Sequence, residues 1–317
     1  MKILLAFPFG DLQTGVYIRN AFESVGCEVV SVDSKENPQN VFTDSEKHNP
    51  DIVFCSREIG LLSEIQKIRE NLPDIKTVCY NVDSRHSVKE WGKELLSLFN
   101  NVHIYYCKPE GNIEESQKCC PDTTVHCLLE GIDPTEHKKE EITESDFSKY
   151  GFDVVFAGSK NEIYKTPIPY GRIGLINFLE KQDFDFKTVS FNPIGSGRFL
   201  GTDHNKLCQC SKIVLGHCGW ADVRLSNSAR DFRVTGAGGF LLTEYVDGME
   251  DLFELGKECE TYKTLEECVE KIKYYIEHEE ERKRIAESGY LRTIKDHTFA
   301  NRMKQVLNDV RKYKCQQ

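Results

Sequence analysis

The stretch KILLAF at residues 2–7 decides the fold, together with GVYIRNAFESVG at 15–26 and EVVSVD at 28–33. The first and third segments are short runs rich in apolar and β-branched residues, and the segment between them repeats its apolar residues at helical spacing. Continuous apolar runs of this length are typical of strands buried on both faces of a parallel sheet. A helix between two such strands predicts a βαβ unit, and hence an α/β fold.

The same alternation continues along the chain and then starts again. The first series goes on through DIVFCS (51–56), LLSEIQKIRENL (61–72), KTVCYNVD (76–83) and VHIYYC (102–107). A second series opens at FDVVFAGS (152–159) and runs through SKIVLGH (211–217), FLLTEY (240–245) and TLEECVEKIKYYIEHEEE (264–281). Two series of this kind predict two Rossmann-like domains.

The boundary between the domains is expected in a polar, charged run at residues 131–150, punctuated by Gly131 and Pro134. We place an N-terminal domain at 1–132 and a C-terminal domain at 133–298. Residues 299–317 repeat apolar side chains at helical spacing. They are predicted to form a last helix that packs back on the N-terminal domain.

Composition narrows the class of protein. The chain has 317 residues, 41 basic and 51 acidic side chains and a net charge of −10, which disfavours non-specific attraction to nucleic acid. The opening residues lack the pattern of a signal peptide, and no apolar run approaches the ~20 residues needed to span a bilayer. We therefore expect a cytoplasmic protein whose 13 cysteines are reduced thiols.

The cysteines give little support for a metal site. The pairs Cys119/Cys120 and Cys208/Cys210 are not accompanied by a second pair at zinc-finger spacing. Cys55, Cys79 and Cys107 stand in or beside apolar runs, where cysteine acts as a small buried hydrophobe. No metal site is predicted.

Ligands of open α/β sheets bind at the carboxyl ends of the strands, so the turns after the apolar runs hold the first candidate residues. Gly10 and Gly15 follow the first run and precede a helix, where backbone N–H groups can approach a phosphate or where the chain simply turns tightly. Asp83 follows KTVCYNV, as a general base on the acceptor side or as a helix N-cap.

The second series offers a further group at strand ends. Gly158 and Ser159 follow DVVFA, and Arg172 opens the next helix, which together suit a diphosphate; an exposed surface charge is the alternative for Arg172. Arg198, in NPIGSGRFLG, either contacts a nucleotide or belongs to a simple turn. His217 ends a strand as a candidate for the donor site, with a core or capping role equally open.

The stretch RDFRVTGAGGFLLTEYVDGMEDLFELGKE at 230–258, with YIEHEEERKRIAESGYLRTIKDHTFANRM after it, carries a resemblance to a known family. From Lys212 to Met303 the chain resembles the C-terminal domain of the CgeB-like, spore-maturation-type glycosyltransferases. The resemblance implies the GT-B architecture: two Rossmann-like domains with parallel sheets that face each other across a cleft. It also implies that the nucleotide-sugar donor binds the C-terminal domain and the acceptor the N-terminal one.

Residue roles follow from the resemblance. Gly238 and Gly239 would let the backbone approach the donor, and Arg230 and Arg172 would stand near the diphosphate, whose charge grows as it leaves. Glu244 or Glu250 would contact sugar or ribose hydroxyls, unless they are solvated surface carboxylates. One position departs from the family pattern, because Arg233 stands where a ribose-binding glutamate is expected.

We therefore predict a glycosyltransferase that uses a nucleotide sugar, with a UDP-sugar as the expected co-substrate, no other cofactor and no bound metal. The acceptor would be a small molecule, a glycan or a protein, with nucleic acid less favoured. Three alternatives remain at this point: a nucleotide-sugar epimerase or hydrolase of the same fold, a non-catalytic nucleotide- or sugar-binding protein, and a metal or redox protein built on the cysteines.

Overall fold

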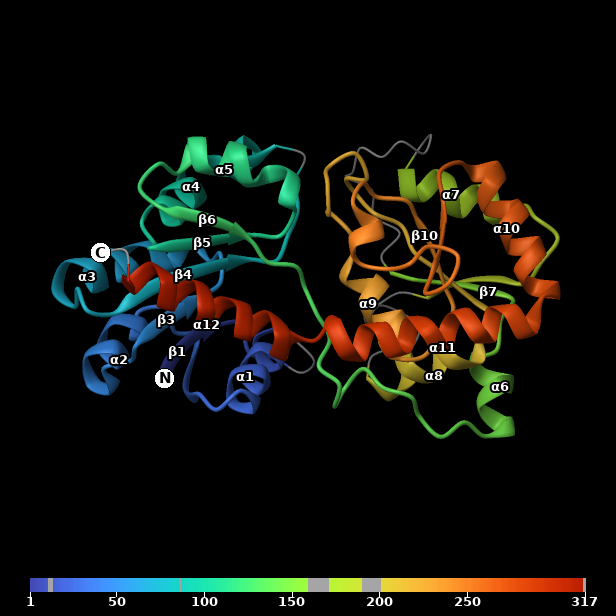
Figure 1. Cartoon of the computed structure of the whole chain (residues 1–317), viewed down its shortest axis with the longest axis horizontal. Coiled ribbons are helices and arrows are strands. Elements are labelled where there is room, and N and C mark those ends of the chain that lie inside the picture. Colours follow the sequence, from blue (N-terminus) through green and yellow to red (C-terminus); the bar gives the residue numbers. More distant parts are fainter. Residues whose placement is uncertain (11–13, 86, 159–170, 190–200, 316–317) are drawn as a thin grey trace. The chain divides into compact units, whose positions relative to one another are not determined.

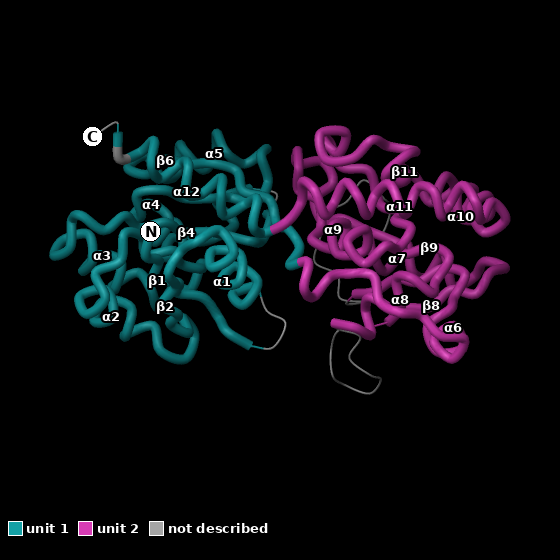
Figure 2. Tube along the Cα trace, turned by 60° about the horizontal axis from the view of Figure 1, so that its bottom comes forward, with its two compact units in different colours: residues 1–133, 299–317 teal, residues 134–298 magenta. Residues whose placement is uncertain are grey.

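The computed structural model of the chain describes residues 1–10, 14–85, 87–158, 171–189 and 201–315, and Figure 1 labels their helices and strands. The chain divides into two compact units, which Figure 2 colours separately. Unit 1 comprises Met1–Asp133 and Phe299–Gln317, and unit 2 comprises Pro134–Thr298. Each unit contains its own parallel sheet.

Unit 1 contains a six-stranded sheet in the order β2-β1-β3-β4-β5-β6. Its strands are β1 (Lys2–Phe7), β2 (Glu28–Asp33), β3 (Ile52–Cys55), β4 (Lys76–Asn81), β5 (Ile104–Cys107) and β6 (Thr124–Cys127). All neighbouring strands pair in parallel, as the continuous apolar runs predicted. The strand order reverses direction between β1 and β3.

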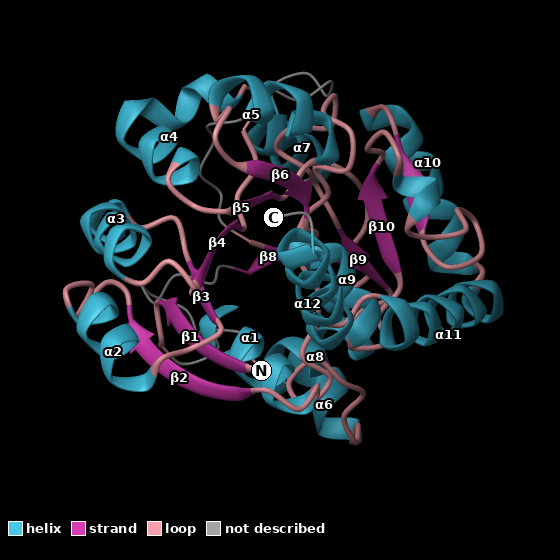
Figure 3. Ribbon diagram, turned by 60° about the vertical axis from the view of Figure 1, so that its left-hand side comes forward, coloured by secondary structure: helices cyan, strands magenta, loops and turns pink. Residues whose placement is uncertain are grey.

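Helices cover both faces of this sheet, so its strands are apolar on both sides. One face packs against α2 (Asn40–His48), α3 (Leu62–Asn71), α4 (Gly92–Asn100) and α5 (Ile113–Cys119). The other packs against α1 (Thr14–Ser24) and α12 (Phe299–Cys315). Figure 3 shows the strands between these two layers. Three short 3-10 helices, η1 (Ile59–Leu61), η2 (Val88–Trp91) and η3 (Glu110–Asn112), complete unit 1.

Helix α12 belongs to unit 1 although unit 2 separates it in sequence from the rest. Its apolar stripe is buried against α1 and the sheet, and consists of Phe299, Met303, Val306, Leu307 and Val310. The helix is also tied by hydrogen bonds, from the backbone N–H of Phe299 to the Ile132 carbonyl at 2.9 Å and from the Tyr106 hydroxyl to Asp309 at 2.9 Å.

Unit 2 contains a five-stranded parallel sheet in the order β11-β10-β9-β7-β8. Its strands are β7 (Val154–Ala157), β8 (Phe186–Val189), β9 (Ile213–Leu215), β10 (Leu241–Glu244) and β11 (Glu260–Tyr262). Counted from the first strand of each unit, this order repeats that of β1 to β5 in unit 1. The reversal here lies between β7 and β9.

The helices of unit 2 are α6 (Glu144–Tyr150), α7 (Gly171–Leu179), α8 (Thr202–Cys210), α9 (Ala229–Gly236), η4 (Met249–Asp251), α10 (Leu265–Glu277) and α11 (Glu279–Asp296). Two of them correct the sequence predictions. The run at 131–150, predicted as a linker, contains α6, because Thr143 and Asp146 form a capping box. The segment 264–281, predicted as one helix, breaks at His278, which has a non-helical backbone.

All 13 cysteines lie in the described part of the chain and have free thiols. Among the described helices, none combines the length and the apolar character needed to cross a bilayer.

Met303 lies on the inner side of α12 and is fully buried, so its replacement tests how much the packing of this helix stabilises unit 1. We expect Met303→Ala to lower the free energy of unfolding of unit 1 by about 2–5 kcal/mol, through lost burial and a residual cavity. Urea unfolding followed by Trp91 fluorescence in a Trp220→Phe background reports unit 1 alone, since these are the two tryptophans.

The control is Lys304→Ala, one residue further along α12 on its exposed side, which is expected to leave the unfolding midpoint unchanged. If Met303→Ala leaves the unfolding midpoint unchanged as well, burial of the Met303 side chain adds no stability to unit 1.

Candidate functional site

The carboxyl edge of the sheet in unit 2 carries a group of polar residues at the point where the strand order reverses. Ligands of open α/β sheets bind outside such a switch point, because the helices on either side of it leave in opposite directions and open a crevice. In unit 2 this point lies between the ends of β7 and β9. Five predicted residues gather at this edge: Gly158, Arg172, His217, Arg230 and Glu244.

Arg230 joins the two strand ends. It lies in the first turn of α9, which Ser228 caps by accepting a hydrogen bond from the Arg230 backbone N–H at 3.3 Å. The Arg230 side chain donates from Nε to the Ala157 carbonyl at 2.8 Å, and from Nη1 to the His217 carbonyl at 3.3 Å. Its guanidinium also lies over the ring of Phe156, 4.8 Å from the centroid. Arg230 is therefore fixed at the switch point.

Gly158 makes room for this guanidinium. A Cβ atom at Gly158 would lie 2.6 Å from Nη2 of Arg230, closer than two non-bonded atoms can stand. Packing against Arg230 thus explains why this position is a glycine, independently of any ligand.

Arg172 supplies a second cation at the same edge. It is the second residue of α7 and is half-buried, and its guanidinium lies 5.7 Å from the centroid of the same Phe156 ring. Burial first, and then the charge of Arg172, lower the pKa of Arg230 to about 10, so that both arginines are charged at neutral pH. The N-termini of α7 and α9 add their partial positive charges. This arrangement can stabilise an anion.

His217 and Glu244 lie beside the arginines and are buried. The Glu244 carboxylate accepts a hydrogen bond from the backbone N–H of Cys218 at 3.1 Å, and its Oε2 atom is 3.6 Å from Nε2 of His217. Burial, followed by the positive charges of Arg172 and Arg230, lowers the pKa of His217 to about 3. The imidazole is therefore neutral at physiological pH, and a hydrogen-bonding group rather than a cation.

One residue at this edge, Asn227, was missed by the sequence predictions. Asn227 directly precedes the cap residue Ser228 and is 2% exposed, and neither atom of its amide has a hydrogen-bond partner among the described residues. Arg233, one turn after Arg230 on α9, is half-buried. A polar side chain just before an N-cap was the signal that could have drawn attention to Asn227.

Gly238 and Gly239 do not join this group. They lie between the end of α9 and the start of β10, at the amino edge of the sheet. A Cβ at Gly238 would meet the side chain of Lys139 at 2.8 Å, and one at Gly239 would meet the Cys208 carbonyl at 2.8 Å. Gly238 also has a φ of 81°, so these glycines serve the turn and its close packing.

Glu250 follows β10 in η4 and is exposed, where it accepts a hydrogen bond from the Tyr245 hydroxyl at 3.0 Å. The predicted residues Ser159 and Arg198 lie outside the described residues.

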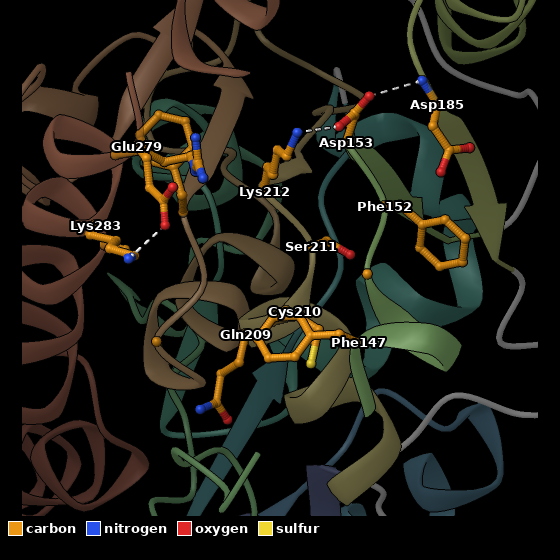
Figure 4. A pocket seen from close by; sticks show the side chains of 16 residues that line it. Phe147, Phe152, Asp153, Asp185, Gln209, Cys210, Ser211, Lys212, Glu279 and Lys283 are labelled. Carbon is orange, nitrogen blue, oxygen red and sulfur yellow. Dashed lines mark hydrogen bonds and ion pairs between the residues drawn. The ribbon is translucent and has the colours of Figure 1, made fainter. Parts of the chain in front are cut away.

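A pocket of 490 Å³ also opens at the amino edge of unit 2, and Figure 4 shows the side chains that line it. Two lysines of the lining are paired with lining carboxylates: Lys212 with Asp153 at 2.7 Å, and Lys283 with Glu279 at 2.6 Å. The backbone N–H of Asp185 donates to Asp153 as well, at 3.2 Å. Both lysines are therefore already paired within the lining, and ligands of open α/β sheets bind at the carboxyl ends of the strands, so the carboxyl edge is the candidate site.

Asp83, Gly10 and Gly15 belong to unit 1. Asp83 lies just beyond β4, donates its backbone N–H to Asn81 at 3.1 Å and forms an ion pair with Arg57, so its carboxylate does not cap a helix. Gly10 lies between β1 and α1. A Cβ at Gly15, in the first turn of α1, would lie 2.4 Å from the Pro8 carbonyl. Gly15 therefore allows α1 to begin close against the preceding loop.

Comparison with protein families finds that the profile of the family described as glycosyl transferase-like matches residues 150–308. No curated protein sequence matches the chain.

Several solved structures share the fold over 98% of this chain. Anabaena Alr3699/HepE, in complex with UDP and glucose, has 15% identity, a TM-score of 0.63 and 100% of its own chain covered. A glycosyltransferase from Rickettsia africae has 11% identity and a TM-score of 0.63, with 98% of its own chain covered. An alpha-glucosyltransferase in complex with UDP-glucose and DNA has 11% identity and a TM-score of 0.65, with 99% of its own chain covered. The predicted GT-B fold, with two Rossmann-like halves, is confirmed.

The depressed pKa of His217 predicts a pH dependence with a definite sign. Histidine in an unfolded chain titrates near about 6.5. Below that pH His217 binds a proton in the unfolded chain but stays neutral in the native one. Its contribution to stability is therefore complete above about pH 6.5 and declines as the pH falls toward about 3. In an NMR titration we expect the His217 ring signals, assigned with a His217→Asn variant, to stay at neutral positions from about pH 8 to about pH 5. A midpoint near 6.5 would contradict this environment.

Proposed function

Since the chain belongs to the glycosyl transferase-like family, we propose that it moves a sugar from a nucleotide-sugar donor to an acceptor, with Arg172 and Arg230 holding the diphosphate. One observation carries the proposal: the Arg230 guanidinium is fixed across the ends of β7 and β9, at the switch point of unit 2 and beside two helix N-termini. Fixed cations at this point suit a nucleoside diphosphate.

The proposed reaction breaks the bond between the anomeric carbon of the sugar and an oxygen of the diphosphate, and forms a bond from the same carbon to an acceptor oxygen. Negative charge grows on the leaving diphosphate, and preorganised cations lower the barrier because they need not reorient during the reaction. The acceptor oxygen loses a proton to a base. Asp83, held in its ion pair with Arg57, stays our predicted base.

We propose that the donor is a uridine nucleotide, with uracil as its base. The structures that resemble this chain include Anabaena HepE with UDP, with UDP-glucose and with UDP and glucose, and an alpha-glucosyltransferase with UDP-glucose. Within the family, we assign the chain to the CgeB-like group, on the stretch 230–258 and the residues that follow it.

A second candidate function, nucleotide binding without sugar transfer, is favoured by one residue. Arg233 occupies the position where related GT-B enzymes usually carry a ribose-binding glutamate. In unit 2 it is the third arginine on helices α7 and α9, after Arg172 and Arg230, and its charge strengthens the attraction for phosphate. The carboxylate that would accept hydrogen bonds from the ribose hydroxyls is absent at this position. Incubation with UDP-glucose and an added acceptor distinguishes the two functions, because only a transferase releases UDP as glucose moves to the acceptor.

Calorimetric titration with UDP tests the donor site. We expect Arg172→Ala and Arg230→Lys to weaken UDP binding about 10-fold to 100-fold, because each loses hydrogen bonds between a guanidinium and a charged oxygen. Arg230→Lys keeps a positive charge at this position but removes the guanidinium that donates to the carbonyls of Ala157 and His217. It therefore tests the guanidinium separately from the charge. Arg284→Ala is the matched control, because Arg284 lies on α11 with its side chain 74% exposed.

Equal binding by all four proteins, or no UDP binding by the wild type, would disprove the proposed donor site. Circular dichroism of each variant separates a loss of binding from a loss of fold.

A further inference from the structure

A second pocket lies at the switch point of unit 1, between the ends of β1 and β3. It has a volume of 350 Å³. The lining includes Thr14 and Gly15 at the start of α1, Lys35 beyond β2 and Arg57 beyond β3. This is the place where an open sheet of this strand order binds a ligand.

Tyr80 on β4 lines the same pocket, and its hydroxyl makes no hydrogen bond within the described residues. The residue is 1% exposed, and its oxygen has no hydrogen-bond partner among the described residues. Burial raises the pKa of Tyr80 well above its ordinary value, so the hydroxyl keeps its proton and is available as a donor. A buried hydroxyl without a partner is costly, and such groups in native proteins call for an explanation. A ligand in the pocket would supply the missing acceptor.

The polar lining consists mostly of hydrogen-bond donors. Lys35 and Arg57 are cations, Tyr80 and Thr14 carry hydroxyls, and the N-terminus of the 11-residue helix α1 adds backbone N–H groups and a partial positive charge. Glu58 is the one carboxylate among the described lining residues. Arg57 is held in place by its ion pair with Asp83 and by the ring of Trp91, whose centroid is 5.1 Å from the guanidinium carbon. A lining rich in donors and cations matches a group that only accepts hydrogen bonds.

We propose that this pocket binds an oxyanion of the acceptor, a phosphate ester or a carboxylate, with the Tyr80 hydroxyl donating to it at the base of the pocket and Lys35 at its rim. The inference rests on the proposed glycosyltransferase function and extends it, because it assigns the acceptor to the class of acidic molecules. It also gives Arg57 two tasks: it contacts the oxyanion and positions Asp83.

The test uses the full chain and four probes in ligand-observed NMR titrations: inorganic phosphate, glucose 6-phosphate, glucuronate and methyl glucoside. We expect phosphate or glucose 6-phosphate to bind if the oxyanion is a phosphate ester, glucuronate if it is a carboxylate, and methyl glucoside in neither case. Tyr80→Phe, which keeps the ring, and Lys35→Ala should each weaken anion binding about 10-fold, the effect of one hydrogen bond to a charged group.

Lys47→Ala is the matched control, because Lys47 is exposed in the last turn of α2, at the opposite edge of the sheet. It should bind the anionic probes as the wild type does. UDP binding, measured by calorimetry, should stay within about 2-fold of the wild type in Tyr80→Phe and Lys35→Ala, since the donor site belongs to unit 2.

The proposal is overturned if no anionic probe binds, if Tyr80→Phe binds them as tightly as the wild type, or if methyl glucoside binds equally well. It is also overturned if both substitutions weaken UDP as much as the anionic probes, because the pocket would then serve the donor. A chain that holds phosphate through Tyr80 but fails to bind UDP would instead disprove the proposed function and leave the anion site in place.

Discussion

The candidate site depends on one interaction, the pair of hydrogen bonds from the Arg230 guanidinium to the carbonyls of Ala157 and His217. The Ala157 carbonyl ends β7, and the His217 carbonyl lies two residues beyond the end of β9, on either side of the point where the strand order reverses. A guanidinium suits this position because its donors are held in a rigid, planar fork, whereas a lysine ammonium is a point charge at the end of a flexible stem. The neighbouring residues accommodate this side chain: the guanidinium lies over the ring of Phe156, and Gly158 has no side chain that would clash with it.

The same constraint places the rest of the site. Helix α9 must begin close to β9 for Arg230 to reach it, and Gly216 allows this approach, because a Cβ there would lie 3.1 Å from Oδ1 of Asp231 on α9 and 2.1 Å from Oγ1 of Thr243 on β10. Thr243 in turn donates to Asp231 at 3.1 Å, a buried carboxylate in the first turn of α9. A carboxylate is favourable at a helix N-terminus, and it offsets part of the arginine charge. His217 stays neutral because it is buried and, in addition, because a third cation would be repelled by Arg172 and Arg230.

Much of this fold could be predicted from the sequence, because the apolar runs are long enough to be buried strands and the segments between them keep a helical period. The candidate site could be predicted only in part. Arg172 and Arg230 open the helices that follow β7 and β9 in the sequence, and His217 lies two residues beyond β9. All three side chains belong to the carboxyl edge of the sheet. Gly238 and Gly239 are near Arg230 in sequence, but the eight residues of α9 extend about 12 Å and carry the chain to the other edge of the sheet. Tyr80 was missed for a different reason, since a tyrosine within an apolar run has the pattern of a core residue.

The two units reach a similar electrostatic arrangement from the same strand order. In each, a helix begins at the switch point and arginine side chains lie at the strand ends, Arg57 in unit 1 and Arg172 and Arg230 in unit 2. In each, buried polar atoms also lack a partner within the described residues, on Tyr80 in unit 1 and on His217 and Asn227 in unit 2. Folding alone gains nothing from such atoms, because a buried polar group without a hydrogen bond destabilises the native state. Their retention beside cations and helix N-termini is understandable if a ligand rich in acceptor oxygens completes each site, as a sugar diphosphate would in unit 2.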